Sequence, residues 1–478
     1  MNGYIMSKLR LVTVEPVLFL YMMIIYLEIN ALQEVIFVKS CIKLNHPENI
    51  SDCSYALKQN MTLAVTQEAT NWSKYNNMVL FFFTFISSFY VGSWSDRLGR
   101  KLPMLVPLIG TCIASTINAL LSYFFDAHLA YFFISSFFSG ITFGTVGIVS
   151  STYGYISDYT HEQSRTKRIV ILESMIFSGA MVGTYVSGAI LSHVRYDAVL
   201  NNFVQLFMFE GAVSAIIAVY VVFRIPNSDD PKWQGPLTFS GLFSLKHVVD
   251  SLRTVFRARE MGKRKKVLLM LVALFACNLG TVVQTYLGYY YVKTQLGWSF
   301  ANYTNFYSVQ LGVEGFALLI FLPFLLHFFH VSDYIVIALG LISRISSFAV
   351  FGLSTKDYMV WSCAAICIFS EFPVPAFRSM LSKTVGPDEK GRIFAFTTVL
   401  MNICFLLGSF VLMTLFNLLD FRGFCFVMVA AIQGISLLIL VYLYFTRKTS
   451  ITNSETTEND DGSVSEITSP LTDSDSIS

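Results

Sequence analysis

Twelve apolar segments, most of them long enough to cross a lipid bilayer as a helix, alternate with polar segments along the chain. The hydrocarbon core of a bilayer is roughly 30 Å thick and needs about 20 apolar residues per helix. With 54% hydrophobic and only 13% charged residues, the chain carries more apolar surface than one soluble core buries. We therefore predict an all-α membrane protein with spans at residues 14–38, 76–94, 103–124, 128–157, 169–193, 199–224, 266–292, 304–329, 333–354, 358–384, 393–416 and 421–446.

The predicted spans form two groups of six. Residues 1–224 make an N-terminal half with an outer loop at 39–74, and residues 266–446 make a C-terminal half. The polar segment 225–265 between them is expected to be a cytoplasmic loop. Residues 447–478 are acidic and rich in Ser and Thr, so we expect a disordered cytoplasmic tail. The first apolar run is longer than a signal-peptide core and is expected to remain as the first helix.

The distribution of Lys and Arg predicts the orientation. Basic residues gather in the segments that share a side with the N-terminus, above all in the cluster at 263–266. Cytoplasmic loops retain positive charge during membrane insertion, which places both termini in the cytoplasm. The basic cluster either anchors this topology or binds anionic lipid.

Glycosylation sequons give an independent test of the orientation. Asn49, Asn60 and Asn71 each begin an Asn-x-Ser/Thr triplet within the loop at 39–74, and Asn302 begins another after the seventh span. Sequons are used only on the extracytoplasmic side. All four fall on the side that the basic residues predict to be outside.

A ten-residue motif lies between the second and third spans. Residues 92–101 read GSWSDRLGRK and resemble the Gly-x-x-x-Asp-x-x-Gly-Arg-Lys signature of the major facilitator superfamily. The resemblance implies the major facilitator fold, with twelve transmembrane helices in two six-helix halves. The matching residues are Gly92, Asp96, Gly99, Arg100 and Lys101.

The resemblance assigns these residues to a gate. Gly92 would let two backbones touch, and Gly99 would permit the tight turn. Asp96 would face the positive end of a neighbouring helix, while Arg100 would pair with Asp158 at the end of the fourth span. Such contacts close the inner side of the transporter and break when it opens inward.

Four further segments resemble solute carrier family 46, the proton-coupled folate transporter family, and favour the branch of its lysosomal member. They are residues 14–16, 157–168, 172–173 and 377–383. The resemblance runs from the first to the last span, outside the first outer loop, the central loop and the tail. It implies transport of an organic solute by alternating access, coupled to protons.

Charges inside a membrane are costly and are therefore functional candidates. Glu173 matches the family's proton-coupling glutamate, and Arg378 matches a functional arginine. Arg378 could bind an anionic group of the substrate. Glu371 precedes it by seven residues, and two helical turns place both on one face. Pro373 and Pro375 between them should bend that helix.

Other polar residues lie at mid-membrane depth. Glu28 in the first span and Gln284 in the seventh are the stronger candidates for substrate binding, because these two spans line the cavity of the fold. For Arg344 we leave two roles open, an ion pair with Glu314 or another acid, and a substrate contact. The remaining members of the set are Asn30, Gln33, Glu34 and Asn402.

The chain departs from the family in two places. The folate transporter has a histidine tied to proton coupling near the outer end of the seventh span, and residues 289–293 contain none. The family pairs a cysteine of the first outer loop with one after the seventh span. Cys53 is present, but Gly297 stands where its partner would be, so we predict that Cys41 pairs with Cys53 in this oxidising loop.

The predicted function is a secondary transporter of an organic solute, proton-linked or facilitative. Folates, pteridine-like drugs, steroid conjugates and muropeptide fragments are within what the resemblance implies. A non-transporting receptor or adaptor of the same fold is the alternative. No nucleotide loop, nucleophile elbow or His-rich cluster points to an enzyme, a cofactor or a metal. We expect a monomer or weak homodimer in the plasma or lysosomal membrane, in contact with lipid and not with nucleic acid.

Overall fold

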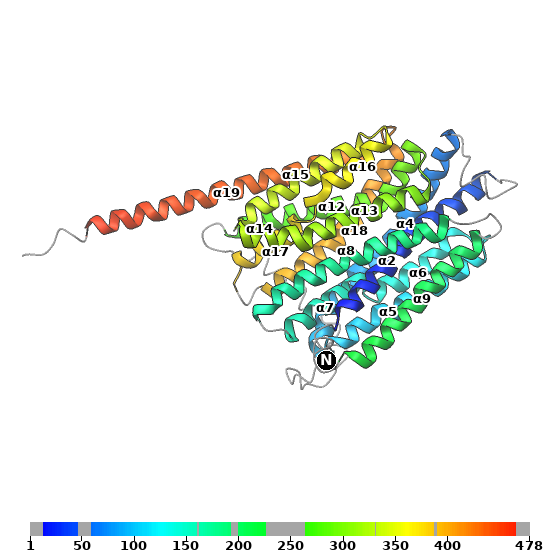
Figure 1. Cartoon of the computed structure of the whole chain (residues 1–478), viewed down its shortest axis with the longest axis horizontal. Coiled ribbons are helices and arrows are strands. Elements are labelled where there is room, and N and C mark those ends of the chain that lie inside the picture. Colours follow the sequence, from blue (N-terminus) through cyan, green and yellow to red (C-terminus); the bar gives the residue numbers. More distant parts are fainter. Residues whose placement is uncertain are drawn as a thin grey trace, which may run out of the picture.

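The computed structural model describes residues 13–45, 59–159, 162–192, 199–225, 263–329, 331–386 and 390–464, and every element in these ranges is helical. Figure 1 shows long helices packed side by side in one bundle. The N-terminal half contains α2 (Glu15–Asn45), α4 (Gln59–Leu98), α5 (Lys101–Tyr123), η1 (Leu129–Tyr131), α6 (Phe132–Ile141), α7 (Gly144–Tyr159), α8 (Glu162–Ser192) and α9 (Val199–Arg224). The C-terminal half contains α12 (Lys263–Leu296), α13 (Phe300–Phe316), η4 (Ala317–Phe321), α14 (Leu322–Phe328), α15 (Asp333–Gly352), α16 (Asp357–Ile366), η5 (Cys367–Phe369), α17 (Pro373–Thr384), α18 (Lys390–Leu418) and α19 (Phe424–Val464).

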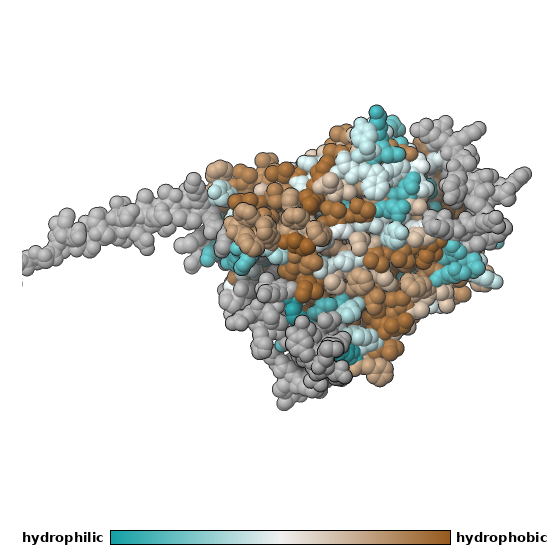
Figure 2. Space-filling view, viewed as in Figure 1, coloured by the Kyte–Doolittle hydropathy of each residue, from teal (hydrophilic) through white to brown (hydrophobic). Residues whose placement is uncertain are grey.

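Most of these helices can span a membrane. Within the described residues, eleven helical stretches have the length and composition to cross a bilayer. α4 is not among these eleven stretches, but it contains the apolar run of the predicted second span and packs inside the bundle against α6 and α18. Figure 2 shows apolar residues along the side of the bundle, as expected for a surface that faces lipid. The predicted all-α fold of two six-helix halves is confirmed.

Short connections make successive helices antiparallel, so the bundle has two ends. We call the end that holds the start of α2 the basal end and the opposite end the distal end; in Figure 1 they lie towards the lower left and the upper right. The basal end holds Glu15, Lys101, Asp158, Lys263 and Asp333, and the distal end holds Asn45, Tyr123, Leu296, Gly352 and Leu418.

The outer loop predicted at 39–74 is largely helical in its described part. α2 continues to Asn45 and α4 begins at Gln59. The hydropathy of the sequence did not predict this extension, because the added turns of α4 are polar. Val65, Ala69 and Ser73 nevertheless recur at helical spacing and are buried, so packing rather than apolar composition holds these turns in place.

The last span also differs from the prediction. α19 continues through the predicted tail to Val464, and Figure 1 shows it projecting away from the bundle. Residues 465–478 and most of the predicted central loop at 225–265 lie outside the described residues. The helix therefore extends about five turns beyond the predicted boundary at residue 446.

The buried apolar residues show how the halves are joined. One cluster combines distal residues of both halves, such as Val35 and Phe37 of α2 with Val292 of α12. At the basal end, the N-terminal half has a separate cluster around Leu18 and the C-terminal half one around Leu271. The halves thus share one core distally, whereas each basal core has its buried residues in one half and, among the described residues, only the partly buried Phe177 of α8 packs against the core of the other.

Small residues set the close packing of α2 against α8. A Cβ atom on Gly183 would lie 2.0 Å from the carbonyl oxygen of Met23, and one on Gly179 would lie 2.3 Å from that of Phe19. Only glycine permits this backbone approach. The contact fixes α8, which carries Glu173, directly against α2, which carries Glu28.

Candidate functional site: a central cavity between the halves

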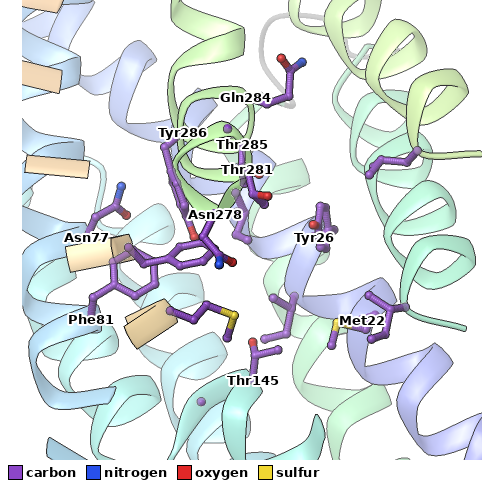
Figure 3. Close-up of a pocket in the computed structure, with 18 of the residues that line it drawn as sticks. Met22, Tyr26, Asn77, Phe81, Thr145, Asn278, Thr281, Gln284, Thr285 and Tyr286 are labelled. Atoms are coloured by element: carbon purple, nitrogen blue, oxygen red, sulfur yellow. The ribbon is translucent and has the colours of Figure 1, made fainter. Parts of the chain in front are cut away.

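A cavity of about 370 Å³ lies between the two halves. The N-terminal half lines it chiefly through α2, α4, α7 and α8, and the C-terminal half through α12, α13, α15, α17 and α18. Figure 3 shows Tyr26 on one side of the space and Phe81 and Tyr286 on the other, with Asn278 and Thr281 between them. A cavity bounded by both halves can change its access when the halves move.

Aromatic side chains form much of the wall. The rings of Phe81 and Tyr286 meet edge to face with centroids 5.6 Å apart, and Phe405 packs on Phe81 at 5.2 Å. On the opposite side, Tyr26 lies 6.4 Å from Tyr307. Such a lining favours a ligand with a large apolar body.

Polar contacts between α2 and α12 close the cavity at the distal end. Gln33 donates a hydrogen bond of 2.8 Å to the carbonyl of Thr285. The Tyr289 hydroxyl donates to Glu34 and accepts a 2.6 Å hydrogen bond from Lys293, whose ammonium lies 3.8 Å from Glu34. These buried contacts cross from one half to the other.

α4 and α18 extend the same seal. Ser73 hydrogen-bonds Tyr290 of α12 at 2.7 Å. Asn417 of α18 donates to Asn71 at 3.0 Å, and Gln67 donates to the carbonyl of Asn417 at 3.3 Å. We call this set of contacts the distal gate, formed by Gln33, Glu34, Gln67, Asn71, Ser73, Thr285, Tyr289, Tyr290, Lys293 and Asn417.

The sequence did not identify the distal gate. Gln33 and Glu34 were recognised only as polar residues of the first span, and 289–293 only as a segment without histidine. The missed signal was that Tyr289 and Lys293 lie four residues apart and therefore on one helical face. Glu34, in another span, is the acidic residue that this face meets. The hydrogen bond between Glu34 and Tyr289 joins residues 255 positions apart, so it depends on how the helices pack.

At the basal end, the ion pairs formed between described residues lie within single halves. Arg168 pairs with Glu15 at 2.6 Å in the N-terminal half, and Lys383 with Asp333 at 2.5 Å in the C-terminal half. Together with the separate apolar cores, this arrangement corresponds to halves that are joined distally and apart basally.

The structure brings together part of the predicted basal gate. Arg100 donates to Asp158 at 2.8 Å, the contact that the sequence predicted, and also to Ser95 at 2.5 Å. Gly99 has a φ of +79°, the left-handed conformation that its tight turn requires. Lys101 donates to the carbonyl of Val222 at the end of α9. Gly92 and Asp96 lie in α4, but their side-chain surroundings are outside the described part.

Glu173 and Arg378 face the cavity from opposite halves. Glu173 belongs to α8 and Arg378 to α17, and each is half-buried in the cavity lining. Tyr153 of α7 lies within electrostatic range of both. Neither charge forms an ion pair with a described residue, so both are available to a ligand, a proton or each other.

Glu371 and Arg378 both line the cavity, although the tenth span is interrupted between them. The tenth span is not a continuous helix: α16 ends at Ile366, the η5 turn follows, and α17 begins at Pro373. Pro373 occupies the first position of α17, where its missing N–H costs nothing. The interruption lies where the sequence predicted that Pro373 and Pro375 would bend the helix, and it leaves both charged residues in the lining of one cavity.

Arg344 supplies the partner of Glu371. Its guanidinium lies 3.3 Å from the Glu371 carboxylate, donates to Thr281 at 2.9 Å and is almost fully buried. Glu314 instead accepts from Ser370 at 3.0 Å. Of the two roles left open for Arg344, the structure favours an interhelical ion pair, formed with Glu371 and not with Glu314.

The two other predicted substrate residues also line the cavity. Glu28 accepts a 3.1 Å hydrogen bond from Asn118 of α5. Gln284 of α12 donates to Gln310 of α13 at 3.3 Å. The cavity therefore contains all four predicted substrate residues together with Glu173.

The predicted glycosylation sites differ in their surroundings. Asn302 is exposed in the first turn of α13. Asn71 is half-buried within α4, where its side-chain oxygen accepts from Lys74 and Asn417. Asn49 lies outside the described residues, as does the side chain of Asn60. Their use as acceptors stays a prediction.

Cys41 forms a disulfide, and its predicted partner Cys53 lies outside the described residues. The six other cysteines are free thiols. We expect mass spectrometry of the non-reduced protein to recover a peptide that joins Cys41 to Cys53. Recovery of either residue as a free thiol in folded protein would contradict the pairing, and Cys112 serves as the control for an unpaired cysteine.

Comparisons with known proteins agree with this architecture. The profile described as "Major Facilitator Superfamily" matches residues 56–368. The chain is 23% identical to the lysosomal proton-coupled steroid conjugate and bile acid symporter SLC46A3 of Gallus gallus, over 91% of this chain and 95% of the relative. It is 22% identical to the proton-coupled folate transporter of Bos taurus, over 89% and 91%.

A solved structure supports the same fold. The human organic anion transporter MFSD10 (TETRAN) superposes with a TM-score of 0.63 at 15% identity, covering 89% of this chain and 98% of that one. The predicted resemblance to solute carrier family 46 is confirmed by the relatives, and the match of the profile to well over half of the sequence shows that the chain belongs to the Major Facilitator Superfamily.

Proposed function

We propose that this chain is a proton-coupled transporter that moves an organic anion by alternating access. The observation that carries the proposal is the central cavity, which both halves line and which the distal gate closes. Glu173 and Arg378 face it as unpaired charges from opposite halves, among the described residues. A proton on Glu173 and an anion beside Arg378 would change the electrostatic balance between the halves. The curated relatives named above are described as proton-coupled transporters, which supports the same function here.

The cavity chemistry supports an amphipathic anion as the substrate. Tyr26, Phe81, Tyr286 and Phe405 offer broad apolar and aromatic surface, while Arg378 offers one positive charge. A steroid conjugate or bile acid combines a rigid apolar body with one anionic group and fits this lining well. Folates and muropeptide fragments carry more polar groups and are the weaker candidates.

The motif at 92–101 and Asp158 would form the basal gate in this mechanism. We expect Asp96→Asn to leave the protein inserted and present at the membrane but to slow the change between its two access states, because the charge facing the neighbouring helix end is lost. Counterflow exchange rates measure this change. Unchanged exchange in a correctly localised variant would remove the gating role. Glu68→Gln, near the distal end and outside the cavity lining, is the control.

We assign the basal end to the cytoplasm from the basic residues of the sequence. The distal end then faces the cell exterior or the lysosomal lumen, from which a proton gradient would drive substrate inward. Both the plasma membrane and the lysosomal membrane fit this direction. Antibody access to tags at the termini, with and without permeabilisation, tests the orientation.

An uptake screen tests the proposed function. Cells that express the chain would receive labelled steroid sulfates, bile acids, folates or muropeptides at mildly acid and neutral pH. We expect acid-stimulated uptake of the amphipathic anions, and its loss in Arg378→Gln. Binding without uptake of any class would favour the alternative, a receptor or adaptor of the same fold.

A further inference from the structure

A second carboxyl group lies behind the cavity wall in the N-terminal half. Glu210, in the middle of α9, is fully buried and does not line the cavity. α9 packs against α5 and α2. Glu28 of α2 does line the cavity and lies within electrostatic range of Glu210. The two acids thus connect the cavity with the interior of the half.

The polar atoms of this group are incompletely paired. Neither carboxyl oxygen of Glu210 has a hydrogen-bond partner, although both are buried. Asn118 of α5 donates to Glu28 at 3.1 Å, but its own side-chain oxygen is also buried without a partner. Buried polar atoms are rarely left unpaired. Three unpaired oxygens on two neighbouring helices, two from Glu210 and one from Asn118, therefore call for a functional explanation.

No described residue supplies a compensating positive charge to the two acids. The titratable groups near the two acids are Tyr21 of α2, Cys112 of α5 and Tyr286 of α12, all of them neutral in their ordinary state. Neither Glu28 nor Glu210 forms an ion pair with any described residue. Glu210 is fully buried behind the cavity wall, so an ionised carboxylate there, with neither a cation nor a hydrogen bond, would cost several kcal/mol, and a second negative charge on Glu28 would add to this cost. At least one of them must therefore carry a proton when this conformation is populated.

We infer that Glu28 and Glu210 form a proton-binding site that exchanges its proton with the cavity through Glu28. The inference rests on the proposed function, in that a transporter cavity must reach Glu28. The site is separate from Glu173, which lies on α8 nearer the basal end. Loss of its proton would place negative charge in the cavity wall, so the pair can couple proton release to the departure of an anion.

A small cation is the competing occupant of these oxygen atoms. Hard cations take six or more oxygen ligands in most protein sites. In the described part of the chain, no group of three or more His, Cys, Asp or Glu residues is arranged to hold a metal ion. Two carboxyls and one amide suit a proton better than a cation of this kind.

Infrared spectroscopy of the full chain in lipid nanodiscs tests the inference without any transport measurement. We expect a carbonyl band of a protonated, weakly hydrogen-bonded carboxyl group that shifts in D₂O and disappears as the pH rises. Glu210→Gln should lose this band, and Glu28→Gln should lose it or shift it. Glu173→Gln, which removes a carboxyl on α8, is the matched control and should keep it.

Two results would overturn the inference. One is a band that is absent from the unaltered protein or persists unchanged in both variants of the pair. If Glu210→Gln does not fold, Glu28→Gln alone decides this point. The other is stabilisation of the unaltered protein by sodium over choline that is lost in Glu28→Gln, which would assign the oxygens to a cation. Because uptake is not measured, a protein that keeps the band but fails to transport would count against the proposed function alone.

Discussion

Glu173→Gln should abolish pH-driven accumulation of substrate while preserving the exchange of substrate already present on both sides. The amide imitates the protonated carboxyl in shape and charge but cannot release a proton. Exchange requires only binding and movement of the halves, whereas accumulation requires net proton flux. Because Glu173 forms no ion pair with a described residue, its neutralisation leaves no buried partner charge exposed to the cavity.

The test compares net uptake with counterflow exchange in proteoliposomes. Glu68→Gln is the matched control, because Glu68 pairs with Lys43 at 3.0 Å near the distal end and does not line the cavity. Net uptake that survives in Glu173→Gln would make Glu173 structural and direct attention to Glu28 or Glu371. Loss of both activities at normal protein levels would instead indicate a role in binding or folding.

Arg344→Met should destabilise the protein strongly. Arg344 is 3% exposed, and its removal leaves the Glu371 carboxylate in the cavity wall without its cation. Breaking a buried ion pair in this way costs about 3–5 kcal/mol, whereas replacing both partners by apolar residues is often close to neutral. The double variant Arg344→Met/Glu371→Met should therefore recover most of the lost stability.

Thermal unfolding in detergent, followed by tryptophan fluorescence, measures the difference. Lys383→Met is the control, since the Lys383 side chain is 67% exposed in its pair with Asp333. Pairs at the surface contribute about 0–1 kcal/mol, so this variant should unfold at nearly the original temperature. Equal unfolding temperatures for Arg344→Met and the double variant would show that the unpaired Glu371 carboxylate is not the cause of the lost stability.

The sequence predicted the fold from features that act locally. Apolar length identified the spans, and the motif at 92–101 identified the turn at Gly99 and the contact of Arg100 with Asp158. These features depend on neighbouring residues or on a recurring motif. The start of α4 was missed because its turns are polar and are held by packing against other helices.

The site was predicted less completely, because it depends on pairs of distant segments. The seal between Glu34 and Tyr289 requires α2 and α12 to meet. The partner of Arg344 became clear only once the break before α17 had placed Glu371. Glu210 was not singled out, although an acidic residue inside a predicted span was a sufficient signal.

Concentrative uptake into proteoliposomes tests the central claim most directly, that a proton gradient drives an organic anion through the cavity between the halves. The purified chain would be given a labelled steroid sulfate, with and without an inwardly directed proton gradient. We predict accumulation above the external concentration only with the gradient, and its collapse on addition of a protonophore. Uptake that reaches the same level with and without the gradient, or binding with no uptake, would contradict the claim.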